Sequence, residues 1–240
     1  MNLHLVIGTP MYGGMCTSEY TQSLLNLSES ANKSDVKLTT IFLGNESLIQ
    51  RGRNTVAHHF MNLPDATHLL FIDADIKFRT QDIVRMIQAD KSLIVGPVAL
   101  KGYNWDEIRQ AAVNNEDDIG RTGGVFNINK LPGIDMVDEN TPFEIEHGGN
   151  AFMMIRRDVF ETLKPHTPIY TNGGRSLPDG VEIYDYFRVE INKDTNHLLS
   201  EDYFLCHSYR QLGGKVWCAP WVETGHFGSH LFNGKYSRNN

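Results

Sequence analysis

The sequence predicts an α/β fold in which a mainly parallel, Rossmann-like central sheet carries helices on both faces. Over about the first hundred residues, short apolar runs alternate with segments whose apolar residues recur at helical spacing. Such alternation is typical of βαβ units, which build a parallel sheet that is buried on both sides. A chain of 240 residues with 40% hydrophobic residues is also long enough for one sizeable core. We therefore expect a single domain over residues 1–240.

The first βαβ unit begins with the apolar run LHLVIGT at Leu3–Thr9, which is bounded by proline and glycine and predicts a short buried strand. A helix is expected next, because Tyr20, Leu24 and Leu27 recur at spacings of four and three residues. The run LTTIFLG at Leu38–Gly44 predicts the second strand of the unit.

The pattern then repeats until about residue 100, where the alternation becomes irregular. Two long polar stretches, 114–124 and 165–197, are interpreted as insertions rather than domain boundaries, and long loops at strand ends often carry substrate. The remaining expected elements are helices over 48–61, 81–89, 158–163 and 200–212 and strands over 68–72, 92–98, within 144–155 and over 215–219.

Composition narrows the class of protein. With 22 basic and 29 acidic residues the formal net charge is -7, so no positive field favours nucleic acid as a partner. Cys16, Cys206 and Cys218 are odd in number and show no C-x-x-C spacing, which argues against a disulfide framework and a cysteine zinc site. A transmembrane helix needs about 18 consecutive apolar residues, and the sequence contains no such run. We therefore expect a cytoplasmic protein, in the host cytoplasm if the chain is viral.

Two carboxylates, Asp73 and Asp75, follow directly after the apolar run HLLFI. Residues two apart in an extended chain point to the same side, so both carboxylates can face one cation. Mg²⁺ and Mn²⁺ prefer carboxylate, phosphate and water oxygens, and ligands of open α/β sheets bind outside the carboxyl ends of the strands. This position favours a divalent metal site, although an isolated D-x-D is more often a solvated turn.

Three ordered segments carry a resemblance to a known family: FIDAD after the apolar strand, HGGNAFMMIRRDVF at 147–160, and LLSEDYFLCHSYRQLGGKVWCAPWVETGHFG at 198–228. Together they resemble metal-dependent nucleotide-sugar glycosyltransferases with the GT-A fold. The resemblance extends from the Leu3 strand to about Gly228. Within that family the chain is similar to bacterial and large-DNA-virus enzymes, algal viruses included, that build surface glycans.

The resemblance implies a nucleotide-sugar donor and Mn²⁺ or Mg²⁺ as cofactor, with residues 1–100 as the nucleotide-binding half and 101–240 as the acceptor-binding half. Asp73, Asp75 and His226 are the implied metal ligands, with Asp73 acting on the ribose or through metal-bound water as the alternative. Ala74 lies between the two aspartates and belongs to the donor site. UDP is the expected nucleotide because it is frequent in the family.

The implied loop for the base and ribose lies at the end of the first strand and contains Thr9, Pro10 and Tyr12. An acidic pair in the segment SED, Glu201 and Asp202, matches the catalytic position of the family. Asp202 is the expected base, which would lead to direct displacement with inversion at the anomeric carbon. Acidic residues in a first helical turn are also favoured by the helix dipole, whatever the function.

Two further groups complete the expected donor site. Arg51, Arg53 and Asn54, in the segment QRGRN, can offer planar donors to the base or diphosphate, and a solvated helix face is the alternative. Gly149 and Asn150, in HGGN, can let backbone approach the donor sugar or acceptor, and a plain turn or bulge is the alternative.

The expected reaction is transfer of a sugar from a UDP-sugar to a hydroxyl of a glycan or glycoprotein acceptor, for which Tyr184 and Tyr186 are candidate stacking residues. One rival is a sugar nucleotidyltransferase, but the loop GTPMYGGM lacks the lysine or arginine usual in that class. Another rival is a catalytically silent glycan-binding module that has kept the fold.

Overall fold

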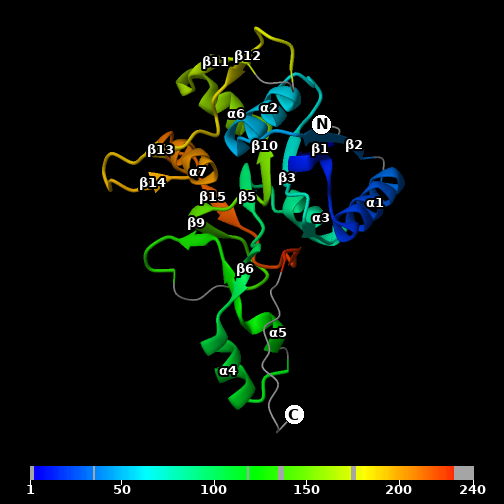
Figure 1. The fold of residues 1–240 in the computed structure, drawn as a ribbon, viewed down its shortest axis with the longest axis vertical. Coiled ribbons are helices and arrows are strands. Elements are labelled where there is room, and N and C mark those ends of the chain that lie inside the picture. Colours follow the sequence, from blue (N-terminus) through cyan, green and yellow to red (C-terminus); the bar gives the residue numbers. More distant parts are fainter. Residues whose placement is uncertain (1–2, 35, 118, 135–137, 174–176, 230–240) are drawn as a thin grey trace.

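The computed structural model describes residues 3–34, 36–117, 119–134, 138–173 and 177–229. At its centre lies a sheet of eight strands in the order β2-β1-β3-β10-β5-β15-β9-β8 (Figure 1). These strands are β1 (His4–Met11), β2 (Lys37–Gly44), β3 (His68–Ile72), β5 (Leu93–Val95), β8 (Ile128–Lys130), β9 (Phe143–Gly148), β10 (Phe152–Arg156) and β15 (Val216–Cys218). All except β9 and β10 run in the same direction. The predicted α/β fold with a mainly parallel sheet is confirmed.

Helices cover both faces of this sheet, as the alternating apolar pattern of its central strands requires. On β3, Leu70 and Ile72 belong to the core beneath α1 (Ser18–Lys33) and α3 (Thr80–Gln88). The other side of the same strand contributes to the core beneath the helices α2 (Ile49–Met61), α6 (Arg157–Leu163) and α7 (Glu201–Gln211).

A lobe made of residues 99–126 extends away from the sheet (Figure 1). Its strands β6 (Ala99–Tyr103) and β7 (Gly124–Phe126) pair with each other, and α4 (Trp105–Val113) and α5 (Ile119–Thr122) lie between them in the chain. The described residues of the irregular polar stretch at 114–124 therefore belong to this lobe.

The remaining short elements form three two-stranded sheets and two 3-10 helices. Two of these sheets lie in or next to the second long polar stretch: β11 (Ile169–Thr171) pairs with β12 (Glu182–Tyr184) beside α2 and α6, and β13 (Glu190–Ile191) pairs with β14 (Leu198–Leu199) beside α7 (Figure 1). The other bounds are β4 (Ile76–Lys77) and β16 (Gly225–His226), with 3-10 helices at Tyr12–Gly14 and Lys164–His166.

The strand expected within 144–155 is in fact two strands, β9 and β10, joined by residues 149–151. The second of them, β10, lies antiparallel between β3 and β5. The Asp73 backbone N–H donates to the Ala151 carbonyl at 3.1 Å, and the Gly96 N–H donates to the Phe152 carbonyl at 2.9 Å. The connection therefore lies at the carboxyl ends of β3 and β5, where ligands of such sheets bind.

Arg157, at the start of α6, ties the end of α2 to the body of the protein. Its guanidinium donates to the carbonyls of Ala66 at 2.7 Å, Phe60 at 3.1 Å, Met61 at 3.3 Å and Leu63. The last carbonyls of a helix have no partner within it, so a cation at this end satisfies them and complements the helix dipole.

We predict that Arg157→Met lowers the free energy of unfolding by about 3 kcal/mol, since several hydrogen bonds from a charged donor are lost and buried carbonyls are left without partners. Chemical denaturation measures the loss. Arg109→Met, which removes an exposed arginine on α4 paired with Asp106, is the matched control and should change stability by less than about 0.5 kcal/mol. Equal effects of the two substitutions would contradict the anchoring role of Arg157.

Candidate functional site

Six of the residues singled out from the sequence line one small cavity at the carboxyl edge of the sheet. The cavity has a volume of about 120 Å³. Its lining includes Arg53, Asp73, Asn150, Asp202 and His226, together with Gly149. These residues come from α2, the end of β3, the β9–β10 connection, the start of α7 and β16. The tertiary structure thus brings together residues that are up to 173 positions apart, from Arg53 to His226.

The pairing of β16 with β4 brings His226 to Asp75. In this pair His226 lies opposite Ile76, the residue that follows Asp75, and the Phe227 N–H donates to the Asp75 carbonyl at 2.9 Å. His226 Nδ1 lies 2.7 Å from the Ala99 carbonyl, so in the neutral ring Nδ1 carries the proton. The lone pair of Nε2 then faces Asp75 Oδ2 at 3.5 Å.

This arrangement fits a divalent cation. A histidine that binds metal through one ring nitrogen commonly donates the other N–H to a backbone carbonyl, which fixes the tautomer. Among the described residues no group of three or more His, Cys, Asp and Glu side chains forms a complete metal cage. A site with two protein ligands suits Mg²⁺ or Mn²⁺, which take their remaining oxygens from phosphate and water.

Arg53 is the central charge of the site and is 4% exposed. Its guanidinium donates to Glu201 Oε1 at 3.2 Å, to the Asn150 carbonyl at 3.2 Å and to Asp73 Oδ1 at 3.4 Å. The helix that carries Arg53, α2, packs closely on β1, because Gly8 has no side chain: a Cβ there would lie only 2.4 Å from the Val56 side chain. One buried cation thus positions three walls of the cavity.

Burial raises the pKa of the Asp73 carboxyl, while Arg53 opposes the rise and the charge of Asp75 adds to it. Burial likewise raises the pKa of Glu201, with Arg53 opposing and Asp202 adding to the rise. The pKa values of both carboxyls therefore depend on the same guanidinium, since Arg53 is the largest influence that lowers each of them.

Asp202, rather than Glu201, faces the cavity. One carboxylate oxygen, Oδ1, accepts from the Ser200 hydroxyl and from the Tyr203 N–H, the latter at 2.8 Å. The other, Oδ2, accepts from the Asn150 N–H at 3.3 Å. Hydrogen bonds from three donors fix the orientation of this carboxylate, while Glu201 is bound to Arg53.

Asn150 has an unusual side chain. It is 1% exposed, and neither its amide nitrogen nor its amide oxygen has a hydrogen-bond partner within the described part of the chain. Its backbone, by contrast, is held at both ends by Arg53 and Asp202. A buried polar group without a partner costs about 1–3 kcal/mol, and the observation calls for an explanation such as a ligand.

The other residues singled out from the sequence lie elsewhere. Arg51 makes a bidentate ion pair with Glu46, at 2.6 and 2.7 Å. Asn54 donates to Asp185 and accepts from the Phe187 N–H, so it fixes the segment after β12. Neither side chain lines the cavity.

The loop after β1 lies beside the two aspartates. The Thr17 N–H, at the start of α1, donates to the Ala74 carbonyl at 2.9 Å. Of the three residues predicted to contact the nucleotide, Thr9 and Pro10 lie within β1, and the Thr9 hydroxyl is buried and bonded to the Tyr20 hydroxyl at 2.6 Å. Tyr12 begins the 3-10 helix after β1 and is 77% exposed. Tyr12 is therefore the most accessible of these three residues.

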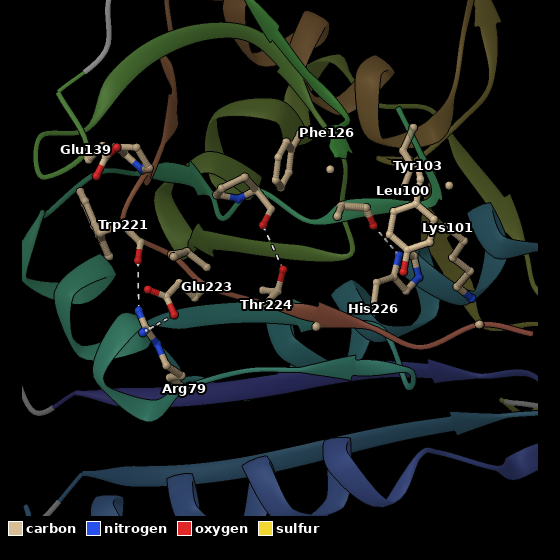
Figure 2. A pocket seen from close by; sticks show the side chains of 18 of the residues that line it. Arg79, Leu100, Lys101, Tyr103, Phe126, Glu139, Trp221, Glu223, Thr224 and His226 are labelled. Carbon is tan, nitrogen blue, oxygen red and sulfur yellow. Dashed lines mark hydrogen bonds and ion pairs between the residues drawn. The ribbon is translucent and has the colours of Figure 1, made fainter. Parts of the chain in front are cut away.

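A second, larger cavity of about 740 Å³ adjoins the first and shares Ala99, Leu100 and His226 with it (Figure 2). In this view Phe126 lies between Tyr103 at one end and Trp221 at the other. Tyr103 is 56% exposed and Phe126 is 49% exposed. The cavity is thus formed by the lobe on one side and by the segment after β15 on the other.

Arg79 fixes the wall of this larger cavity opposite the lobe. It pairs with buried Asp82 at 2.8 Å and with Glu223 at 2.6 Å, and it donates to the Trp221 carbonyl at 3.3 Å. The two tyrosines expected to stack on an acceptor are placed differently: Tyr184 and Tyr186 stack on each other and pack against the core.

Sequence reasoning missed two residues of the site, Asn127 and Lys101. Asn127 lines the small cavity and its backbone carbonyl accepts from the Gly149 N–H at 3.0 Å. Lys101 on β6 forms an ion pair with Asp75, Nζ to Oδ2, at 2.5 Å. Both lie in the irregular middle of the sequence, and the positive charge of Lys101 is the only signal that could have indicated it.

No protein-family model and no curated protein matches the chain. Among solved structures, the A197 protein from STIV has a TM-score of 0.50 at 13% identity, over 98% of this chain and 99% of that one. GalNAc-T7, solved with UDP, GalNAc and Mn²⁺, has a TM-score of 0.46 at 11% identity, over 93% of this chain and 44% of that one. The chain thus spans less than half of GalNAc-T7.

A third solved structure is a glycosyltransferase involved in the glycosylation of the major capsid of PBCV-1, with a TM-score of 0.34 at 10% identity, over 68% of this chain and 64% of that one. At such identities these likenesses concern the fold alone, and the one with A197 extends over almost the whole length of both chains. No helix in the described ranges is long and apolar enough to cross a membrane.

The raised pKa of Glu201 predicts a pH dependence of stability. Between its ordinary value of 4.5 and the raised value, the folded chain binds more protons than the unfolded chain, so stability falls as pH rises through this window. In Glu201→Gln this loss is absent, so the melting temperature of the variant should rise relative to that of the wild type as the pH increases above about 4.5. Glu161→Gln, an exposed change on α6, is the control, and an equal gain there would contradict the prediction.

Proposed function

We propose that the chain is a glycosyltransferase that moves a sugar from a UDP-sugar to a hydroxyl of a glycan or glycoprotein. One observation carries the proposal: the Asp202 carboxylate, the unpartnered Asn150 amide, Asp73 and His226 line a single cavity, with the Asp75 carboxylate beside His226. A fixed carboxylate next to a pair suited to a divalent cation is what displacement of a nucleoside diphosphate by a hydroxyl needs.

Each residue has a defined role in this proposal. Asp202 accepts the proton of the attacking hydroxyl, and its three hydrogen bonds keep an oxygen oriented for that transfer. Asp75 and His226 hold the cation, and Asp73 lies beside them to bind ribose or a metal-bound water. A divalent cation bound there would stabilise the negative charge that develops on the leaving diphosphate. Attack by the acceptor opposite that leaving group inverts the anomeric carbon.

The larger cavity is the proposed acceptor site. Its volume of about 740 Å³ lies in the range of small-molecule sites, and it opens toward the small cavity at Ala99, Leu100 and His226. Tyr103 and Phe126, both about half-exposed, offer apolar ring faces of the kind on which a sugar ring stacks.

The first test combines ligand binding with turnover. UDP should raise the melting temperature in the presence of Mn²⁺ and lose this effect in excess chelator, because a ligand that binds only the folded state stabilises it. Asp75→Ala should abolish the Mn²⁺-dependent part. Asp202→Asn keeps the volume of the side chain, and it should keep UDP binding while lowering transfer by about 100-fold or more, as expected for loss of a general base.

The outcomes also separate the rival functions. Full transfer activity in both variants would overturn the assigned roles. Release of pyrophosphate from a nucleoside triphosphate and a sugar phosphate would show a sugar nucleotidyltransferase instead. Glycan binding without turnover of any nucleotide-sugar would favour the silent binding module.

Asn150 offers a second test, in which stability and activity should change in opposite directions. Asn150→Leu removes a buried amide that has no partner among the described residues and keeps four side-chain heavy atoms that branch at Cγ, so we predict an unchanged or higher melting temperature. Transfer activity should nevertheless fall by at least about tenfold, because a hydrogen bond to the substrate is lost. A lower melting temperature with unchanged activity would assign Asn150 a structural role. Asn172→Leu is the control: that buried amide donates to the Leu177 carbonyl at 2.9 Å, and its loss should destabilise the fold.

A further inference from the structure

One oxygen atom of Asp75 is shared by two groups from distant parts of the chain. Its Oδ2 lies 2.5 Å from the ammonium nitrogen of Lys101 and 3.5 Å from His226 Nε2. Figure 2 shows Lys101 and His226 at the same end of the larger cavity. The ammonium therefore occupies one of the coordination positions of the carboxylate that would bind a cation.

The stem of Lys101 has a defined path to this position. A Cβ at Gly228 would lie only 2.7 Å from Lys101 Cδ, so the side chain passes directly over the backbone of that glycine. The segment containing Gly228 is itself fixed to Asp75 by the Phe227 N–H. The Lys101 side chain is 45% exposed, and the lysine also lines the larger cavity, so its ammonium has free space into which it can move.

The ion pair and a divalent cation are mutually exclusive in this geometry. A cation coordinated by both Asp75 and His226 must contact Oδ2 and Nε2, and Oδ2 is the oxygen that the Lys101 ammonium already contacts at 2.5 Å. A divalent cation and an ammonium that contact the same carboxylate oxygen repel each other strongly in a partly buried site. Lys101 must therefore leave Asp75 when a cation binds there. A nucleoside diphosphate bound to that cation supplies new oxygens for the displaced ammonium.

We propose that Lys101 is an electrostatic gate of the donor site. Without a donor, its ammonium neutralises Asp75 and weakens the binding of a free divalent cation. When the cation binds together with a nucleoside diphosphate, the ammonium moves from Asp75 to the diphosphate. This inference rests on the proposed function for the identity of the ligand, but its own subject is the exchange of partners by Lys101.

The gate makes the binding of cation and nucleotide cooperative. In its first position Lys101 opposes the cation, and in its second position it favours the nucleotide. The coupling between two ligands is a free energy, so each must strengthen the binding of the other by the same factor. Removing the ammonium should therefore change the two affinities in opposite directions, which a purely structural role of the lysine would not do.

The test uses Lys101→Met, whose unbranched side chain can keep the contact with Gly228. Titration of Mn²⁺ followed by electron paramagnetic resonance should show about fivefold tighter binding to the variant than to the wild type in the absence of nucleotide. Calorimetric titration of UDP at saturating Mn²⁺ should show about fivefold weaker binding, since a charge-assisted contact to phosphate is lost. Lys101→Arg keeps the charge and should stay closer to the wild type in both measurements.

Two control variants separate this effect from a general change in charge. Lys77→Met removes an exposed lysine two residues after Asp75 and should leave both affinities nearly unchanged. Adding Asp75→Asn to Lys101→Met should abolish the gain in Mn²⁺ affinity. The gate is overturned if Lys101→Met binds free Mn²⁺ no more tightly than the wild type, or if its affinity for UDP is unchanged.

Failure of the gate is distinguishable from failure of the proposed function. If the two affinities shift in opposite directions but no nucleotide-sugar supports transfer, the gate stands and the glycosyltransferase proposal fails. If transfer depends on Asp202 and Mn²⁺ while Lys101→Met leaves both affinities unchanged, the enzyme assignment stands and the gate is wrong.

Discussion

The candidate site depends on the buried guanidinium of Arg53. Taking a charge out of water costs several kcal/mol unless it is paired, so this side chain must be satisfied by its surroundings. Glu201, Asp73 and the Asn150 carbonyl satisfy it, and they come from α7, the end of β3 and the β9–β10 connection. Because one planar group bonds all three, none of these segments can move far without leaving the cation unpaired. The hydrogen bonds of Arg53 thus hold the walls of the cavity in place before any ligand binds.

This constraint also separates the two neighbouring acids at the start of α7. Glu201 is used to neutralise Arg53, which leaves Asp202 facing the cavity with its carboxylate oriented by hydrogen bonds. Asn150 connects the two, because its carbonyl accepts from Arg53 and its N–H donates to Asp202. Its side-chain amide is the one group in this network without a partner among the described residues, which makes it the natural contact for a substrate.

Much of the fold and part of the site could be predicted from the sequence because their signals are local. The apolar run before Asp73 indicated a buried strand, and the strand ends where the run ends. The same holds for α2 and α7, whose apolar residues recur at helical spacing. The division of this segment into β9 and β10 was not predicted, since two short apolar strands in succession look like one segment until their partner strands are known.

What the sequence by itself determined is which residue types follow each strand: the acids at Asp73 and Asp75, the amide at Asn150 and the histidine at His226. Only the tertiary structure decided which of them face a common cavity. Arg51 and Arg53 are two residues apart on one helix, yet Arg51 pairs with Glu46 while Arg53 is buried in the site. Residues two apart on a helix point about 200° apart around its axis, so the packing of α2 on the sheet selects one of them. Lys101 was likewise beyond prediction, because its contact with Asp75 arises from β6 and β16 meeting in space, and no periodicity records such a meeting.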